Sequence, residues 1–157
     1  MQIEELMSRP VLVCGPNDTL QIPAQLMWDQ GVGCVVVQKE GKVIGVITDR
    51  DICMGAYTSG QALWELPVSR SMTAAPATID ATATVDDAEQ LMRQHHVRRL
   101  PVIDANGVLV GVISLDDLAR EARRQFGRGI DGIAATLGAV ADARTPKRPS
   151  NGTLKPR

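Results

Sequence analysis

The chain contains one internal repeat, and this repeat constrains its fold more than any other feature of the sequence. Residues of the first half recur at a shift of 65 positions, until Asn106 adds one residue and the shift becomes 66. The matched segments are Met7 with Met72, Leu26-Met27 with Leu91-Met92, Val32 with Val97, Gly45-Val46-Ile47-Thr48 with Gly111-Val112-Ile113-Ser114, and Asp51 with Asp117. Two copies are too few to stack as a solenoid, so the sequence predicts two similar units that pack against each other.

Both halves show the same order of local patterns. A short extended stretch precedes an amphipathic helix, two apolar strands follow with a tight turn between them, and a second helix closes the half. In the second half, Asn106-Gly107 is typical of a hairpin turn, and Thr84 with Asp87 predicts a capping box. In the first half we expect Thr19 to be the N-cap and Pro23 to lie in the first turn. The sequence therefore predicts an α/β (α+β) fold of two β-α-β-β-α units.

The repeat also indicates the domain organisation. We expect unit 1 to span residues 3–58, a linker residues 59–71, and unit 2 residues 72–124. Residues 125–157 are a C-terminal extension, in which 130–143 predict a weakly amphipathic helix. The tail that follows carries five basic residues and no acidic ones among prolines, which is typical of a disordered segment.

Charge and composition exclude several classes of function. The net charge is −1, and removing the five bases of the tail leaves −6 on residues 1–143, which opposes broad binding of nucleic acid. Four aromatic residues are too few for a base-stacking platform, and no apolar run approaches a membrane span. Acidic residues precede any base at the N-terminus, unlike a secretory signal, and three cysteines form no CxxC pair. We expect a cytoplasmic protein without a membrane or nucleic-acid partner.

Both second helices open on the pattern Gly-x-x-Thr/Ser-x-x-Asp. The hydroxyl comes from Thr48 or Ser114, and the carboxylate three residues later from Asp51 or Asp117. One interpretation is a capping box, in which hydroxyl and carboxylate satisfy backbone N–H groups. The other adds a function: a helix N-terminus suits a phosphate, and a carboxylate beside it can accept both hydroxyls of a ribose. The pattern leaves both interpretations open.

With these motifs the repeat resembles the cystathionine-β-synthase (CBS) domain, and the tandem resembles a CBS pair, or Bateman module. The resemblance covers residues 3–124, and segments 48–52 and 96–102 are most similar to small stand-alone bacterial CBS-pair proteins of the hypoxic-response type. It implies two units packed through their sheets about a pseudo-two-fold axis, with two clefts between them. It also implies that pairs form homodimers shaped like a disc.

The resemblance further implies a regulatory sensor that binds an adenosine-containing ligand and acts on an effector protein. The ligand would be AMP, ADP, ATP, NAD or S-adenosylmethionine, with no required cofactor, no metal and no catalysis. The ligand-binding residues carried over by position are Val13, Thr48, Arg50, Asp51, Thr78, Arg98, Arg99, Leu100, Pro101, Ser114 and Asp117.

The roles implied for these residues differ between the halves. Both aspartates would hold a ribose, with Thr48 and Ser114 near the ribose or first phosphate. Thr78 would contact adenine, while its counterpart Val13 keeps only the backbone contact. Arg50 would reach a phosphate, and Arg98 or Arg99 would complete the phosphate site. We take Leu115 as the counterpart of Arg50, so we expect unequal clefts.

A second hypothesis is a structural or stress-related dimer whose ligand sites have decayed and which acts through protein–protein contacts. The missing arginine and the pair Val35-Val36, where the second half has Leu100-Pro101, favour it. The paired carboxylates have no nucleophile at a plausible spacing, so we expect no enzyme. Adjacent His95-His96 have the wrong spacing for a metal pair. Cys14 and Cys34 are either buried thiols or a redox pair.

Overall fold

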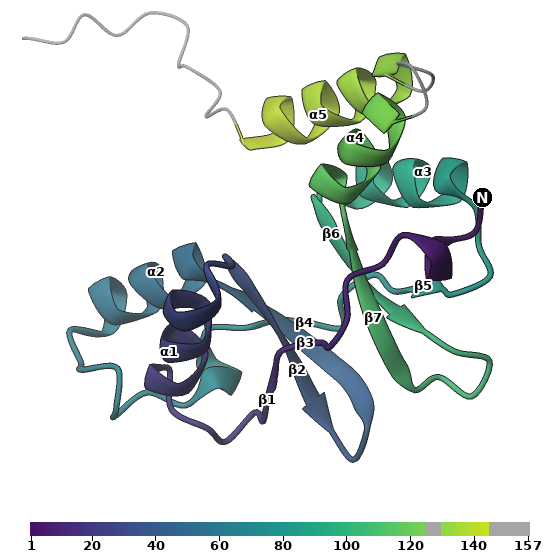
Figure 1. Cartoon of the computed structure of the whole chain (residues 1–157). Helices are drawn as coiled ribbons and strands as arrows, with labels where there is room; N and C mark the ends of the chain where they lie inside the picture. The colour runs from purple at the N-terminus through teal and green to yellow at the C-terminus, as the bar shows by residue number, and fades with distance from the viewer. Residues whose placement is uncertain (125–129, 145–157) are drawn as a thin grey trace, which may run out of the picture.

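The computed structural model describes residues 1–124 and 130–144, which form two lobes with one sheet each (Figure 1). This confirms the α+β fold of two similar units. The tail that the sequence predicts to be disordered spans residues 144–157. Arg144 is the last residue of the C-terminal helix, and residues 145–157 lie outside the described residues.

The first lobe holds a four-stranded sheet in the order β1-β2-β3-β4, with helices α1 and α2. Its elements are β1 Val13–Cys14, α1 Gln21–Gln30, β2 Cys34–Lys39, β3 Lys42–Thr48, α2 Asp49–Ser59, the 3-10 helix η2 Val68–Arg70 and β4 Thr73–Ala74. Strand β1 is parallel to β2, whereas β2-β3 is an antiparallel hairpin. Glu40 and Gly41 both have positive φ angles, of 52° and 78°, as a two-residue hairpin turn requires.

The second lobe repeats this order with a three-stranded sheet, β5-β6-β7. Its elements are the 3-10 helix η1 Ile3–Glu5, β5 Ile79–Asp80, α3 Val85–His95, β6 Arg99–Ile103, β7 Leu109–Ser114, α4 Leu115–Arg124 and α5 Ile130–Arg144. The hairpin at Asn106-Gly107 is confirmed, although its loop is longer than two residues. The carboxylate of Asp104 accepts hydrogen bonds from the N–H groups of Asn106 and Val108, both at 2.9 Å, and Gly107 takes the positive φ.

The segments that open the two halves are exchanged between the lobes. Ser8, in the segment that opens the first half, exchanges backbone hydrogen bonds of 2.8 and 3.2 Å with Val112 in the second lobe. Thr73, its counterpart in the repeat, pairs with Val46 in the first lobe. Each sheet is therefore extended by the segment that opens the other half, and this exchange joins the two lobes.

The exchange explains the glycine of the repeated motif. A side-chain carbon at Gly111 would collide with the sulfur of Met7, and one at Gly45 with the sulfur of Met72. Met7 belongs to the core of the second lobe and Met72 packs against the core of the first. The glycine of the motif therefore makes room for a methionine of the exchanged segment.

The helix starts are partly as predicted. Thr84 and Asp87 form the capping box at α3, and Pro23 lies in the first turn of α1. Thr19 is not the N-cap of α1: Leu20 takes that position without a side-chain cap. The reason is tertiary, because Thr19 forms a β-bridge with Pro67 and the N–H of Leu20 donates to the carbonyl of Leu66 at 2.8 Å.

Helix α5, where the sequence predicts a helix over 130–143, lies across α3 and α4 (Figure 1). Arg93 of α3 donates to Thr136 of α5 at 2.8 Å and to Glu89 at 3.2 Å. Thr136 and Val140 are buried. The outer helical face of the second lobe is therefore covered by the chain itself.

Candidate functional site

Two clefts of about 320 Å³ each lie where the lobes meet. The first cleft brings Thr48, Arg50 and Asp51 of the first lobe together with Arg98 and Arg99 of the second. Its wall is completed by the apolar stretch 75–77. Five of the predicted site residues therefore lie in one cavity, although they come from opposite halves of the sequence.

The second cleft is the counterpart of the first under the repeat. Ser114 and Asp117 occupy the positions of Thr48 and Asp51, and residues 10–12 those of 75–77. Arg99 and Cys34, which are themselves counterparts, line both clefts. The two cavities thus adjoin each other and share a single guanidinium group.

In the first cleft, one oxygen of Asp51 is engaged by the helix cap. Oδ2 accepts a hydrogen bond from the Thr48 hydroxyl at 2.7 Å and another from its N–H at 2.9 Å, and the Asp51 N–H donates to Thr48 Oγ1 at 3.2 Å. Across the described residues, no hydrogen bond reaches Oδ1 of Asp51. The capping interpretation is therefore confirmed, and it leaves one carboxylate oxygen available to a ligand.

In the second cleft, Asp117 makes the same cap with Ser114 but also uses its other oxygen. The Ser114 hydroxyl and N–H donate to Oδ2 at 2.5 and 2.9 Å. Arg120 donates to Oδ1 at 3.2 Å, in an ion pair at the cleft surface. A ligand at this aspartate has to share or displace an exposed arginine.

The capping box of Thr84 and Asp87 at α3 is an example of the same motif outside the clefts. Its three hydrogen bonds match those of the cleft helices. The two that the carboxylate accepts, from the hydroxyl and the N–H of Thr84, hold the pKa of Asp87 below its usual value. Neither residue lines a cleft between the lobes. The same local sequence therefore serves helix stability in α3, and position distinguishes Asp51 and Asp117 from Asp87.

The expected counterpart of Arg50 is wrong. Arg50 is the second residue of α2, and the second residue of α4 is Asp116, not Leu115. Leu115 is buried in the core of the second lobe, whereas Asp116 is exposed and lines the second cleft. The clefts are unequal as expected, but the difference is a reversal of charge.

The arginines of the first cleft are not engaged by protein carboxylates. In the described part of the chain, the ion pairs formed involve Arg93, Arg120 and Arg124. Arg50 and Arg98 are exposed, and Arg99 is half-buried at the start of β6. Their charges are therefore available to a ligand.

Four predicted site residues do not line either cleft. Leu100 has no exposed surface and belongs to the core of the second lobe, and Pro101 is buried beside it. The linings of the clefts do not support a ligand contact by either residue, and their role stays a prediction. Val13 and Thr78 are half-buried and directly follow the lining stretches 10–12 and 75–77.

Other lining residues were missed by the sequence analysis. Asp116 and Arg120 line the second cleft, and His95 lines the first. The repeat itself gives Asp116, since a shift of 66 from Arg50 reaches it. Arg120 lies one helical turn after Asp117, which is the spacing of an ion pair within a helix.

The cysteines are present as free thiols. Burial raises the pKa of Cys14 to about 11. Burial likewise raises the pKa of Cys34 to about 11, although the nearby Arg99 acts in the opposite direction. Both thiols are therefore protonated at neutral pH and are poor nucleophiles, so the structure favours buried thiols over a redox pair.

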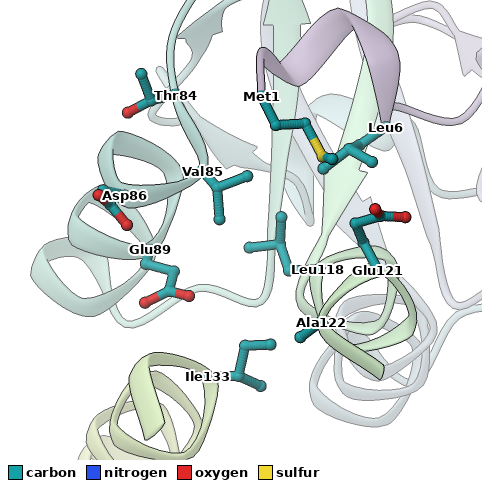
Figure 2. Close-up of a pocket in the computed structure, with 10 residues that line it drawn as sticks. All are labelled: Met1, Leu6, Thr84, Val85, Asp86, Glu89, Leu118, Glu121, Ala122 and Ile133. Atoms are coloured by element: carbon teal, nitrogen blue, oxygen red, sulfur yellow. The ribbon is translucent and has the colours of Figure 1, made fainter. Parts of the chain in front are cut away.

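A third cavity, of about 360 Å³, lies within the second lobe between α3, α4 and α5 (Figure 2). Met1 and Leu6 border it on one side and Ile133 on the other, and its polar groups include Asp86 and Glu89. None of the predicted site residues lines it.

Two further searches cover residues 1–124 and 130–144. No group of three or more His, Cys, Asp or Glu side chains that could hold a metal ion is found among them. No helix in these ranges has the length and apolar character needed to cross a membrane.

The fold and the clefts define a tandem pair of α+β units that share two cavities. The chain belongs to the CBS domain family: the model of the CBS domain matches it twice, at residues 3–55 and 67–124. The resemblance found in the sequence is thereby confirmed.

Known relatives agree with this assignment. The CBS domain-containing protein YhcV of Bacillus subtilis (strain 168) is 38% identical over 117 residues, which cover 74% of this chain and 82% of that protein. The structure of Hypoxic Response Protein I with two coordinated zinc ions aligns at 27% identity with a TM-score of 0.69, over 76% of this chain and 98% of that chain. A CBS domain protein from Pyrobaculum aerophilum complexed with AMP aligns at 28% identity with a TM-score of 0.69, over 90% of this chain and 99% of that chain.

Proposed function

We propose that this protein is a regulatory sensor that binds an adenine nucleotide in the first cleft and has no catalytic activity of its own. The observation that carries the proposal is the combination of three arginines without carboxylate partners and one aspartate oxygen without a hydrogen-bond partner in one cavity of the described chain.

The chemistry of the first cleft matches the parts of a nucleotide. Arg50, Arg98 and Arg99 against Asp51 leave two positive charges in excess, and guanidinium groups bind phosphate by charge-assisted, often bidentate hydrogen bonds. The N-terminus of α2 adds the positive end of a helix dipole. Oδ1 of Asp51 is available to accept ribose hydroxyls, and the apolar stretch 75–77 offers a surface for the base.

Two further facts support the proposal. A volume of about 320 Å³ lies within the usual range of small-molecule sites, about 300–1,000 Å³. The relative from Pyrobaculum aerophilum, which shares the fold, was solved with AMP.

A sensing role follows from where the cleft lies. Its aspartate comes from the first lobe and two of its arginines from the second. A bound nucleotide would therefore connect the lobes, and it would shift their arrangement by its difference in affinity for the alternatives. An effector protein that reads this arrangement is part of the proposal.

The proposal includes no catalysis, because the candidate nucleophiles near the first cleft are not activated. The thiol of Cys34 is protonated at neutral pH, and the Thr48 hydroxyl donates to Asp51 within the helix cap. Neither is poised as a nucleophile. The proposal accordingly requires no cofactor.

The test is isothermal titration of AMP into the full chain and into Asp51→Asn. Asparagine can keep an acceptor for the cap but loses the second carboxylate oxygen, so we expect the AMP affinity to fall about tenfold or more. Asp87→Asn is the matched control, because it alters the same capping box outside the clefts. AMP binding that is equal in both variants, or no binding of AMP, ADP or ATP at millimolar concentration, would contradict the proposal.

A second candidate function is a homodimer that acts through protein–protein contacts. Trp28, Tyr57 and Trp64 are 85, 80 and 68% exposed, and Ile22 and Met54 are also exposed. These residues lie on α1, on α2 and in the segment after α2, and exposed aromatic and methionine side chains of this kind are typical of interfaces. Helix α5 covers the corresponding helices α3 and α4, so the uncovered face belongs to the first lobe.

The homodimer is tested by the molar mass in solution, measured by light scattering after size-exclusion chromatography. We expect a dimer for the native chain and a monomer for the double variant Trp28→Glu/Tyr57→Glu. Val108→Glu is the control, because Val108 is an exposed apolar residue of the second lobe. A native chain that is a monomer at all concentrations would overturn this candidate.

A further inference from the structure

The two clefts share a plan but differ in charge at two matched positions. Where the first cleft has Arg50, the second has Asp116. Where the first has Arg98, the second has Gly33. Each of these changes leaves the second cleft without a positive charge that the first cleft has.

The position of Gly33 also lies close to an acid. A side-chain carbon built at Gly33 would lie 3.3 Å from Oδ2 of Asp49, the first residue of α2. The N–H of Arg50 holds this carboxylate through Oδ1 at 2.7 Å. Asp49 itself lines neither cleft, so its carboxylate lies close to the Gly33 position without being part of the cavity wall.

The two arginines of the second cleft are either paired with a carboxylate or shared with the first cleft. Arg120 pairs with Oδ1 of Asp117 at 3.2 Å, and Arg99 is shared with the first cleft. Asp116 and Asp117 balance these two charges, so the second cleft has no excess of positive charge. If Arg99 turns to a phosphate in the first cleft, the second becomes net negative.

We infer that the second cleft selects an adenosine compound that carries no phosphate and is uncharged or positively charged at its 5′ position, such as a sulfonium nucleoside. This inference rests on the proposed function, because it assumes that Asp117 receives a ribose as Asp51 does. Asp116 repels an anion and attracts a cation at the point where Arg50 would hold a phosphate. The protein then binds two classes of adenosine compound at the same time: phosphorylated compounds in the first cleft and compounds without a phosphate in the second.

The experiment titrates three probes, AMP, adenosine and S-adenosylmethionine, into the full chain and four variants. Asp51→Asn and Asp117→Asn each disable one cleft, and Asp116→Arg gives the second cleft the charge of the first. Asp86→Arg is the control, because Asp86 is also the second residue of a capped helix but lies outside both clefts. Thermal unfolding of each variant verifies that it is folded.

We expect AMP to bind one site that is weakened about tenfold by Asp51→Asn and not by Asp117→Asn. Adenosine or S-adenosylmethionine binds a site with the opposite dependence. Asp116→Arg weakens S-adenosylmethionine about tenfold and raises the AMP stoichiometry from one to two, whereas Asp86→Arg changes neither.

Three results would overturn the inference: AMP bound at two equal sites in the native chain, neither adenosine nor S-adenosylmethionine bound through Asp117, or Asp116→Arg without effect on either ligand class. The proposed function fails separately. If S-adenosylmethionine binds through Asp117 while AMP does not bind through Asp51, the inference about the second cleft stands and the nucleotide site in the first does not.

Discussion

Replacing Arg50 by alanine should weaken AMP binding in the first cleft and leave unchanged the binding of adenosine, which the account assigns to the second cleft. Arg50 is exposed and, among the described residues, forms no ion pair, so its removal breaks no contact within the protein. Stability should therefore change by less than about 0.5 kcal/mol.

The magnitude follows from the charges in the cleft. A hydrogen bond to a charged group contributes about 1.5–3 kcal/mol when it is shielded from water. Solvent screens an exposed arginine, and Arg98 and Arg99 remain to hold the phosphate, so we take about 1–2 kcal/mol. This corresponds to a loss of AMP affinity of roughly 5- to 30-fold.

The assay is isothermal titration with AMP and with adenosine, in about 0.05 and 0.3 M salt. The difference between native chain and variant should shrink at high salt for AMP, because the Debye length shortens. Arg70→Ala, another exposed arginine of the first lobe, is the control. Equal losses for AMP and adenosine, or an equal loss in Arg70→Ala, would refute a phosphate contact by Arg50.

Three further predictions concern stability. Gly111→Ala should lower the free energy of unfolding by about 1–3 kcal/mol through collision with Met7, and Met7→Ala should remove most of this difference in urea denaturation. Thr84→Ala should cost about 1 kcal/mol through loss of the α3 cap, without altering AMP affinity. The raised pKa values of Cys14 and Cys34 favour the folded state fully below pH 9, and this contribution is lost as the pH rises toward 11. The urea midpoint should therefore decrease as the pH is raised from about 8.5 to about 10.5, and it should decrease less in a double alanine variant of the two cysteines. An equal decrease in the native chain and the variant would contradict this prediction.

The repeated units were predictable from the sequence because their signals are local. Apolar periodicity, the turn residues and the capping box of Thr84 with Asp87 each act within a few residues, and each is confirmed. The exchange of the opening segments was not predictable, because Ser8 and Thr73 pair with strands far away in sequence. Another long-range pairing, the bridge between Thr19 and Pro67, moved the N-cap of α1 from Thr19 to Leu20.

The site was predicted in part for a similar reason. Thr48, Asp51 and Arg50 fall within one helix start, so their proximity follows from the chain itself. Their meeting with Arg98 and Arg99 depended on a resemblance, and the lobes do bring these residues into one cleft. The reversal of charge was predictable but missed: the shift of 66 that matches Asp51 to Asp117 also matches Arg50 to Asp116, whereas Leu115 was taken as the counterpart.

The central claim is tested most directly by a crystal structure of the full chain grown with AMP. The account predicts AMP in the first cleft, with ribose hydroxyls on Oδ1 of Asp51 and the phosphate against Arg50, Arg98 or Arg99. It also predicts no AMP in the second cleft, where Asp116 opposes the phosphate. AMP seated at Ser114 and Asp117, or bound outside both clefts, would contradict it.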